Sequence, residues 1–255
     1  MSGRFPIKRR GNGQALLNLA CGTKMHWEWN NVDFSPYAYL RHHKKAADLA
    51  RKVGLITPLR QERLEQVDPD IVYWDLRKGI PFEPGSFDAV YHSHFLEHLD
   101  RDVGPIVLQQ CYHALKPGGV LRVVVPDLQY LTRQYLAAVE ERKQSRPQAT
   151  EKHSRAVDDL IDQMVRSDFS GKAANPLAAR IEKFVRGNAA AAGETHRWMY
   201  DEYSLRDLLE KIGFRDVRVE TCLTSRIADW PSFKLDQNPD GSEYKPESLY
   251  MEGLK

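Results

Sequence analysis

The residues between 70 and 127 constrain the fold most strongly, because three short apolar runs alternate there with loops and one helix-like segment. The runs are rich in β-branched and aromatic residues and cover 71–74, 87–91 and 120–125. This alternation is typical of βαβ units in a parallel sheet. Each run ends on acidic or polar residues, namely Asp75, His92-Ser93-His94 and Asp127. Open α/β sheets bind ligands outside the carboxyl ends of their strands, so these ends predict the functional edge.

The other elements of the sheet follow from similar patterns. Strands are predicted over 15–20, 31–34, 70–75, 87–94, 120–126, 216–222 and 247–255, and helices over 37–53, 103–115 and 205–211. Lys116-Pro117-Gly118-Gly119 ends the second helix, because proline cannot continue a helix and glycine supplies a positive φ. Ser204 is the expected N-cap of the third helix. Only nine residues, 22–30, separate the first two strands, so we expect a compact turn there.

Residues 128–195 interrupt the alternation of strands and helices. They read as two or three helices, over 128–143, 150–167 and 177–186, followed by an alanine run with glycine at both ends. We expect a helical insertion over the strand ends, and the glycines are compatible with either hinge motion or a flexible loop. The predicted organisation is a basic arm over 1–14, a core over 15–127, the insertion or lid over 128–195, and the rest of the core over 196–255.

Charge and cysteine content restrict the partners and the compartment. The chain has 37 basic and 35 acidic residues, a formal net charge of +2, which predicts no general affinity for nucleic acid or anionic membranes. Its three cysteines are scattered and form no CxxC pattern, which favours a reducing cytoplasm. No apolar run approaches the roughly 20 residues that a membrane-spanning helix needs. We therefore expect a cytoplasmic protein without a membrane span, and the sequence leaves its oligomeric state open.

Five ordered motifs resemble those of the class I S-adenosylmethionine-dependent methyltransferases. Residues 17–22 match the glycine-rich first motif, 31–33 the second and 75–76 the third, and the later landmarks are 81–90 and 115–121. The resemblance covers 15–127 and, less closely, 196–255. It implies an α/β, Rossmann-like fold with a mostly parallel seven-stranded sheet and a helical insertion after the fifth strand. Partly through its tail, 246–253, the chain is most similar to predicted methyltransferases linked to polysaccharide and lipopolysaccharide biosynthesis.

The resemblance also implies which residues bind S-adenosylmethionine. The implied cofactor residues are Asn18, Ala20, Cys21, Gly22, Asp33, Asp75, Leu76 and His92. Asp33 would accept the ribose hydroxyls and Asp75 the adenine amino group, with Leu76 or a neighbour against the ring. The chain departs from the first motif, because Asn18 replaces an acid, and Ala20 and Lys24 replace glycines. Lys24 is one candidate to hold the methionine carboxylate.

Transfer of a methyl group to a hydroxyl benefits from a general base beside the acceptor. Candidates are His94, His98, Asp127 and His196, and we favour His196 or His94, with Tyr130, Arg197 and Trp198 in the substrate pocket. The leading hypothesis is O-methylation of a sugar or glycan hydroxyl, which rests on the resemblance. Alternatives are a phenolic or natural-product acceptor beside Trp198, Tyr200 and Tyr203, and a non-catalytic cofactor-binding or scaffold protein. A nicotinamide enzyme is disfavoured without Gly-x-Gly-x-x-Gly, and an RNA methyltransferase without a basic tract.

The segment His94-x-x-Glu97-His98 permits a metal site. Some class I enzymes carry Glu-x-x-Glu-His here as a divalent-metal site, and positions i, i+3 and i+4 share one face of a helix. However, Leu-Glu-His is widespread at this place in members that bind no metal. We therefore expect no metal and keep the site of His94, Glu97 and His98 as the alternative.

Overall fold

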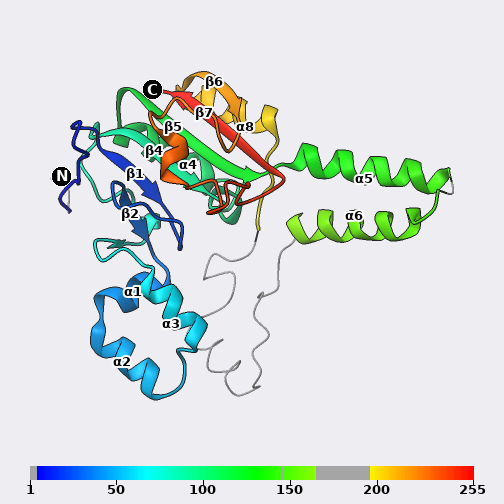
Figure 1. Ribbon diagram of the computed structural model, residues 1–255. Helices are drawn as coiled ribbons and strands as arrows, with labels where there is room; N and C mark the ends of the chain where they lie inside the picture. The colour runs from blue at the N-terminus through cyan, green and yellow to red at the C-terminus, as the bar shows by residue number, and fades with distance from the viewer. Residues whose placement is uncertain (1–4, 145, 165–195) are drawn as a thin grey trace.

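A computed structural model describes residues 5–144, 146–164 and 196–255. Its core is a seven-stranded sheet of order β3-β2-β1-β4-β5-β7-β6 (Figure 1). The strands are β1 (Leu16–Leu19), β2 (Asn30–Asp33), β3 (Val72–Tyr73), β4 (Phe87–Ser93), β5 (Leu115–Pro126), β6 (Arg215–Glu220) and β7 (Ser248–Leu254). β7 runs antiparallel between β5 and β6, and the other pairs are parallel. The predicted mostly parallel, seven-stranded fold is confirmed.

The sheet is buried on both faces. Alternate side chains of its central strands belong to two hydrophobic clusters, one on each face. On one face, Leu17 and Leu19 pack with Val90 and with helices α4 (Val103–Ala114) and α8 (Glu202–Ile212). On the other, Leu16 and Tyr91 pack against Trp29 and against α9 (Trp230–Phe233). This period of two is what a strand requires when both of its faces are covered.

The segment between β2 and β3 differs from the single long helix expected over 37–53. It forms α1 (Pro36–His42), α2 (Lys44–Lys52) and α3 (Pro58–Glu65). The break falls at His43, whose φ of −117° and ψ of 73° are not helical. The third strand was predicted over 70–75 but contains only Val72–Tyr73. It ends early because the chain turns at Asp75 into a 3₁₀ turn, η1 (Leu76–Lys78). Residues 22–30 form the expected compact turn without a helix.

Two predicted boundaries were wrong. The Lys116–Gly119 segment does not separate α4 from the next strand, because β5 begins at Leu115 and pairs with Phe87 across a register shift near Asp88. Ser204 is not the N-cap of α8. Asp201 is the cap, and Ser204 completes a capping box by accepting a hydrogen bond from the backbone amide of Asp201.

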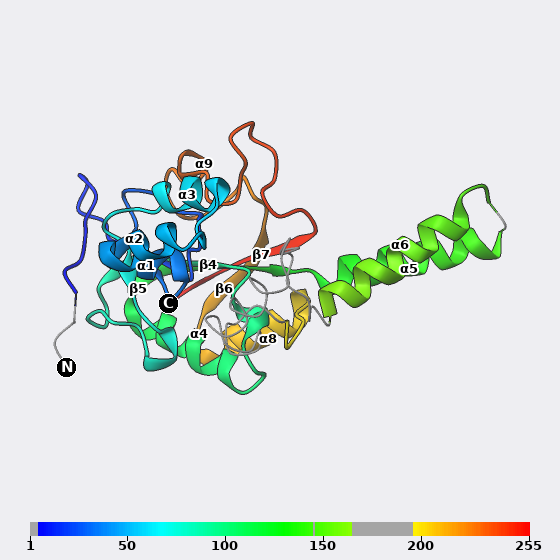
Figure 2. The same ribbon diagram turned by 90° about the horizontal axis from the view of Figure 1, so that it is seen from below.

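The insertion begins directly after β5 with helices α5 (Leu128–Lys143) and α6 (Ala149–Met164). The two helices lie side by side and project away from the sheet (Figures 1 and 2). α5 and α6 therefore do not cover the strand ends as expected of a lid, and the remaining predicted parts, the helix over 177–186 and the alanine run, lie outside the described residues. Among the helices described, none is both long and apolar enough to cross a bilayer.

Candidate functional site

A cavity of about 240 Å³ lies at the carboxyl ends of the two central strands β1 and β4. Its walls come from the loop after β1, the end of β4 and the segment 235–245, and they include Asn18, Gly22, Lys24, Tyr91, Ser93 and His94. The chain moves from β1 to β2 on one side and later returns to β4 on the other. Such a reversal of strand order is where open α/β sheets bind ligands.

The loop after β1 is shaped by two residues in the left-handed region. Ala20 has a φ of 50° and Gly22 a φ of 53°, and both line the cavity together with the buried Cys21. The side-chain nitrogen Nδ2 of Asn18 donates to the Lys24 carbonyl at 2.9 Å and to Oδ1 of Asn31 at 3.1 Å. Asn18 therefore fastens both ends of this loop, while its own Oδ1 is buried without a hydrogen-bond partner among the described residues.

Asp33 and Asp75 lie at the same rim of the sheet, as the resemblance implies. β2 and β3 are adjacent and parallel, and the amide of Trp74 donates to the Asp33 carbonyl at 3.0 Å. The carboxylate of Asp33 is buried, with Oδ2 accepting from the Gly22 amide at 2.7 Å and Oδ1 from the Ser35 amide at 2.6 Å. Each oxygen keeps a further lone pair, so the carboxylate can still accept from ribose hydroxyls.

Arg77 fixes Asp75 at the start of η1. Its guanidinium donates to both carboxylate oxygens of Asp75 at 2.8 Å, and these hydrogen bonds lower the pKa of Asp75. Leu76 is buried in the core, so it does not offer a surface to an adenine ring. Phe34 does so instead, because it is half exposed and stacks on Tyr73 with ring centroids 5.0 Å apart. Sequence reasoning missed Phe34, although an apolar residue directly after a strand-ending acid was a usable signal.

His92 does not reach the cavity, contrary to the expectation that it binds the cofactor. Alternate residues of a strand face opposite sides of the sheet, and here Tyr91 and Ser93 line the cavity. The imidazole of His92 is fully buried next to Phe95, with ring centroids 5.7 Å apart. Burial lowers the pKa of His92 to about 4, against the opposing charge of Glu97.

His94 is the candidate base that lines the cavity. Its φ of 48° places the backbone in the left-handed region, where a residue other than glycine costs free energy. Its Nε2 lies 2.9 Å from Oγ of Ser248, at the start of β7. Its Nδ1 lies 3.1 Å from Oε1 of Glu97.

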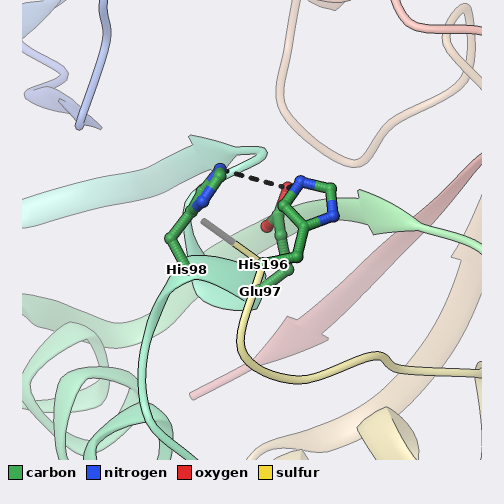
Figure 3. Close-up of side chains that lie close together, drawn as sticks. All are labelled: Glu97, His98 and His196. Carbon is green, nitrogen blue, oxygen red and sulfur yellow. Dashed lines mark ion pairs between the residues drawn. The ribbon is translucent and has the colours of Figure 1, made fainter. Parts of the chain in front are cut away.

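Glu97 is the centre of a buried cluster with His98 and His196 (Figure 3). Glu97 and His98 belong to a 3₁₀ turn, η2 (Leu96–His98), and Nε2 of His98 and Nε2 of His196 lie 3.9 and 4.0 Å from Oε1 of Glu97. Burial opposes ionisation of Glu97, but the imidazoles of His94 and His98 outweigh it and lower the pKa of this carboxyl.

The segment that follows the insertion is held against this cluster by its backbone. The amides of Arg197 and Trp198 both donate to the Glu97 carbonyl, at 2.7 and 3.2 Å. This arrangement brings His196 to Glu97 from a place 99 residues later in the sequence. The sequence contains the histidine but no local signal of this contact.

The remaining predicted site residues have other neighbours. Asp127 does not line the cavity, because it is the N-cap of α5 and accepts from the Gln129 amide at 2.9 Å. Arg197 forms an ion pair with Asp100 at 2.5 Å, and Trp198 lies under the guanidinium of Arg101 at 4.5 Å. Tyr130 is 37% exposed on α5. The structure therefore does not gather these residues around the cavity.

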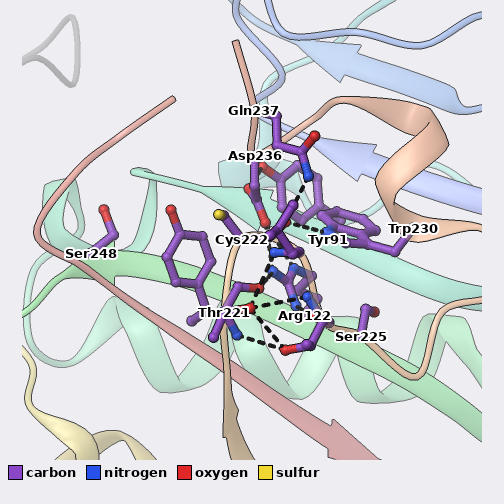
Figure 4. Close-up of polar contacts among 12 residues, drawn as sticks. Tyr91, Arg122, Thr221, Cys222, Ser225, Trp230, Asp236, Gln237 and Ser248 are labelled. Carbon is purple, nitrogen blue, oxygen red and sulfur yellow. Dashed lines mark hydrogen bonds and ion pairs between the residues drawn. The ribbon is translucent and has the colours of Figure 1, made fainter. Parts of the chain in front are cut away.

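The segment 235–245, which forms the far wall of the cavity, is anchored by a buried ionic network (Figure 4). Arg122, fully buried in β5, donates to Asp236 at 2.7 Å and to Glu252 at 3.0 Å, and the Tyr91 hydroxyl donates to Asp236 at 2.6 Å. Burial raises the pKa of Asp236, although Arg122 opposes the shift. The same network therefore connects β4, β5 and β7 with the loop over the cavity.

The side chain of Lys24 binds the loop over the cavity. Its ammonium donates to the carbonyls of Gln237 and Lys234, at 2.5 and 3.2 Å, and lies 4.1 Å from the ring centroid of Tyr244. Burial lowers the pKa of Lys24, with Asp236 opposing. Two of its three donor hydrogens are thus used within the protein, so the structure does not favour Lys24 as the main partner of a methionine carboxylate.

Comparison with known proteins agrees with this geometry. Residues 10–123 match the family model described as a methyltransferase domain. The matched residues include β1 to β4 and most of β5, and with them the loop after β1, Asp33, Asp75 and His94. The expected α/β fold class is confirmed by the strand order, and the match to a methyltransferase domain supports S-adenosylmethionine as the cofactor. No curated protein matches the sequence.

Several solved structures resemble the chain at low sequence identity. A methyltransferase from Mesorhizobium loti is 17% identical, with coverage of 98% of this chain and 94% of that one and a TM-score of 0.42. One from Archaeoglobus fulgidus is 14% identical, with coverage of 94% and 85% and a TM-score of 0.39. Phosphoethanolamine N-methyltransferase 2 from Haemonchus contortus, solved with S-adenosylmethionine, is 14% identical, with coverage of 98% and 50% and a TM-score of 0.42. We infer no substrate or residue role from these structures.

Proposed function

We propose that this chain transfers a methyl group from S-adenosylmethionine to a hydroxyl group of a sugar or glycan. The observation that carries the proposal is the position of His94, which lines the cavity between β1 and β4 and contacts Glu97. The methionine part of the cofactor would lie in this cavity, along the loop from Asn18 to Gly22. Asp33 would accept the ribose hydroxyls, and Phe34 and Asp75 would contact adenine.

Methyl transfer requires mainly that the acceptor oxygen is close to the methyl carbon and in line with the carbon–sulfur bond. The oxygen forms a bond to the methyl carbon, the carbon–sulfur bond breaks, and its electron pair remains on sulfur. The hydroxyl proton must leave, and we assign its removal to His94. His196 does not line the cavity, so it is the weaker of the two favoured candidates.

A sugar or glycan acceptor is supported by the tail of the chain. Residues 246–253 carry part of the resemblance to polysaccharide-linked methyltransferases, and Ser248 in this tail contacts His94 at 2.9 Å. A phenolic acceptor has less support. Tyr200 is buried in the core and Tyr203 is 62% exposed, so these rings do not form a slot with Trp198.

The test begins with calorimetric titration of S-adenosylmethionine into the full chain. It continues with a radiolabelled methyl-transfer assay against sugar nucleotides, oligosaccharides and phenols. We expect cofactor binding and transfer to a saccharide, and His94→Asn should reduce turnover by about 10²–10⁴-fold with cofactor affinity kept. His113→Ala, which removes an exposed histidine on α4, is the matched control and should retain full turnover. Absence of cofactor binding would leave a scaffold protein, and transfer to phenols alone would overturn the saccharide acceptor.

A further inference from the structure

The carboxylate of Glu97 is fully buried, yet neither of its oxygens has a hydrogen-bond partner of good geometry among the described residues. Nitrogen atoms of three imidazoles surround Oε1, at 3.1 Å for His94, 3.9 Å for His98 and 4.0 Å for His196. Leaving a buried charged group without hydrogen bonds is costly, so native structures satisfy such groups or use them as ligands.

The hydrogen bonds of His196 determine which of its nitrogens faces Glu97 with a lone pair. Its Nδ1 lies 2.5 Å from the carbonyl oxygen of Gln163, near the end of α6. A carbonyl can only accept, so Nδ1 carries the hydrogen. In the neutral ring, Nε2 then presents its lone pair toward Oε1 of Glu97.

His94 faces the same carboxylate in the same electronic state. The Ser248 hydroxyl donates its hydrogen to the Lys245 carbonyl at 2.7 Å, so it accepts from Nε2 of His94 at 2.9 Å. The lone pair of the neutral His94 ring is therefore on Nδ1, which lies 3.1 Å from Oε1 of Glu97. With both rings neutral, two nitrogen lone pairs would face one carboxylate and repel it, so the arrangement requires a positive charge among them, either a proton on an imidazole or a metal ion.

We propose that Glu97, His98 and His196 bind one divalent transition-metal ion. Their ligand atoms all lie within 4.8 Å of one another, a separation that small side-chain movements close around an ion with bonds of roughly 2.0–2.2 Å. Two imidazoles and a carboxylate favour zinc or manganese over magnesium, which prefers oxygen ligands alone. The hydrogen bond from Nδ1 of His196 to a carbonyl is also typical of histidines that bind metals.

This site deepens the proposed function and rests on it for its role. The three ligands do not line the cavity, but Glu97 contacts His94, which does. An ion bound by Glu97 would hold this carboxylate in place beside Nδ1 of His94 and would thereby fix the orientation of the imidazole. The ion therefore has a positioning role for His94 in the proposed transfer to a saccharide.

The test uses the full, tag-free chain after treatment with a chelator and dialysis. Zinc, manganese and magnesium salts are titrated separately by calorimetry, and bound Mn²⁺ is followed by electron paramagnetic resonance. We expect one zinc or manganese ion per chain, weaker binding of magnesium, and a melting temperature that rises with ion concentration, because an ion that binds only the folded chain stabilises it. A wild-type chain that binds neither zinc nor manganese would overturn the site.

Variants locate the ion within the cluster. Glu97→Gln, His98→Ala and His196→Asn should each weaken ion binding by roughly 100-fold or more, since each removes a ligand. His113→Ala removes an exposed histidine outside the cluster and should bind the ion normally. His98 is only half-buried, so His98→Ala remains informative if the Glu97 variant does not fold. Unchanged ion affinity in a folded His98→Ala or His196→Asn variant would contradict this ligand set.

Titration of S-adenosylmethionine without metal separates this inference from the proposed function. Cofactor binding and full methyl transfer by the metal-free chain would leave the function standing and overturn the role assigned to the ion, whereas the ion titrations test the site itself. Ion binding at these residues without cofactor binding would support the site and overturn the function.

Discussion

The carboxylate of Asp33 accepts a 2.7 Å hydrogen bond from the backbone amide of Gly22, so the loop after β1 is fastened to the end of β2. Asp33→Ala should therefore weaken S-adenosylmethionine binding by roughly 10–100-fold, because hydrogen bonds to a charged group each contribute about 1.5–3 kcal/mol. The same substitution leaves two backbone amides without their acceptor and should reduce the free energy of unfolding. Calorimetry and urea denaturation measure the two effects.

Asp70→Asn is the matched control for that variant. Asp70 precedes β3, and its side chain is 71% exposed, so the substitution should change neither cofactor affinity nor stability measurably. Cofactor affinity that stays at the wild-type value in Asp33→Ala would contradict the assignment of the ribose to this carboxylate.

We expect Lys24 to stabilise the loop over the cavity and to affect cofactor binding mainly through that loop. Lys24→Met removes the hydrogen bonds to the carbonyls of Lys234 and Gln237 and keeps an apolar chain beside Tyr244. We expect faster proteolytic cleavage within 234–245, measured by mass spectrometry, and a modest loss of cofactor affinity. Lys52→Met on the exposed surface of α2 is the control. A large loss of affinity with unchanged cleavage would instead show that Lys24 holds the methionine carboxylate.

Much of the fold could be predicted, because the sheet depends on short-range patterns. Short apolar runs marked the central strands, and the acids at 33 and 75 marked the carboxyl ends of two neighbours. The break at His43 could not be predicted, since the residues on both sides favour a helix equally. His92 was misplaced because the face on which a strand residue lies depends on the register of the strand, and a slip of one residue exchanges the two faces.

The site was less predictable because its key contacts join distant parts of the chain. Arg122 stands in a run, 120–126, that is otherwise apolar, and its partners Asp236 and Glu252 come more than 100 residues later. His196 reaches Glu97 only because the backbone after the insertion hydrogen-bonds to the Glu97 carbonyl. Such contacts follow from tertiary packing, on which local patterns carry no information.

The capping box of α8 predicts a pH dependence of stability. The pKa of Asp201 is lowered, chiefly by the hydrogen bond from Ser204. An acid with a lowered pKa in the folded state stabilises above its unfolded-state pKa, about 3.9, and loses that contribution as the pH falls through its folded-state value. Asp201→Ala should therefore cost about 1 kcal/mol at pH 7, and its difference from wild type should shrink below pH 4.

Asp201→Asn separates the cap from the charge. Asparagine caps helices about as well as aspartate but does not ionise, so this variant should lose little stability at pH 7. Melting temperatures of the wild type and both variants between pH 7 and pH 3.5 provide the measurement. A constant difference between wild type and Asp201→Ala across this range would show that the charge of Asp201 contributes nothing.

Arg122 should be important for the stability of the fold and of the loop over the cavity. Arg122→Met removes the guanidinium between Asp236 and Glu252 and leaves two buried carboxylates without their cation. Breaking a buried ion pair on one side costs about 3–5 kcal/mol, so we expect a loss of that size in the free energy of unfolding by urea. Arg51→Met breaks the exposed pair with Asp48 and should cost about 1 kcal/mol or less. Equal losses of unfolding free energy in the two variants would mean that the buried network stabilises the protein no more than an exposed ion pair does.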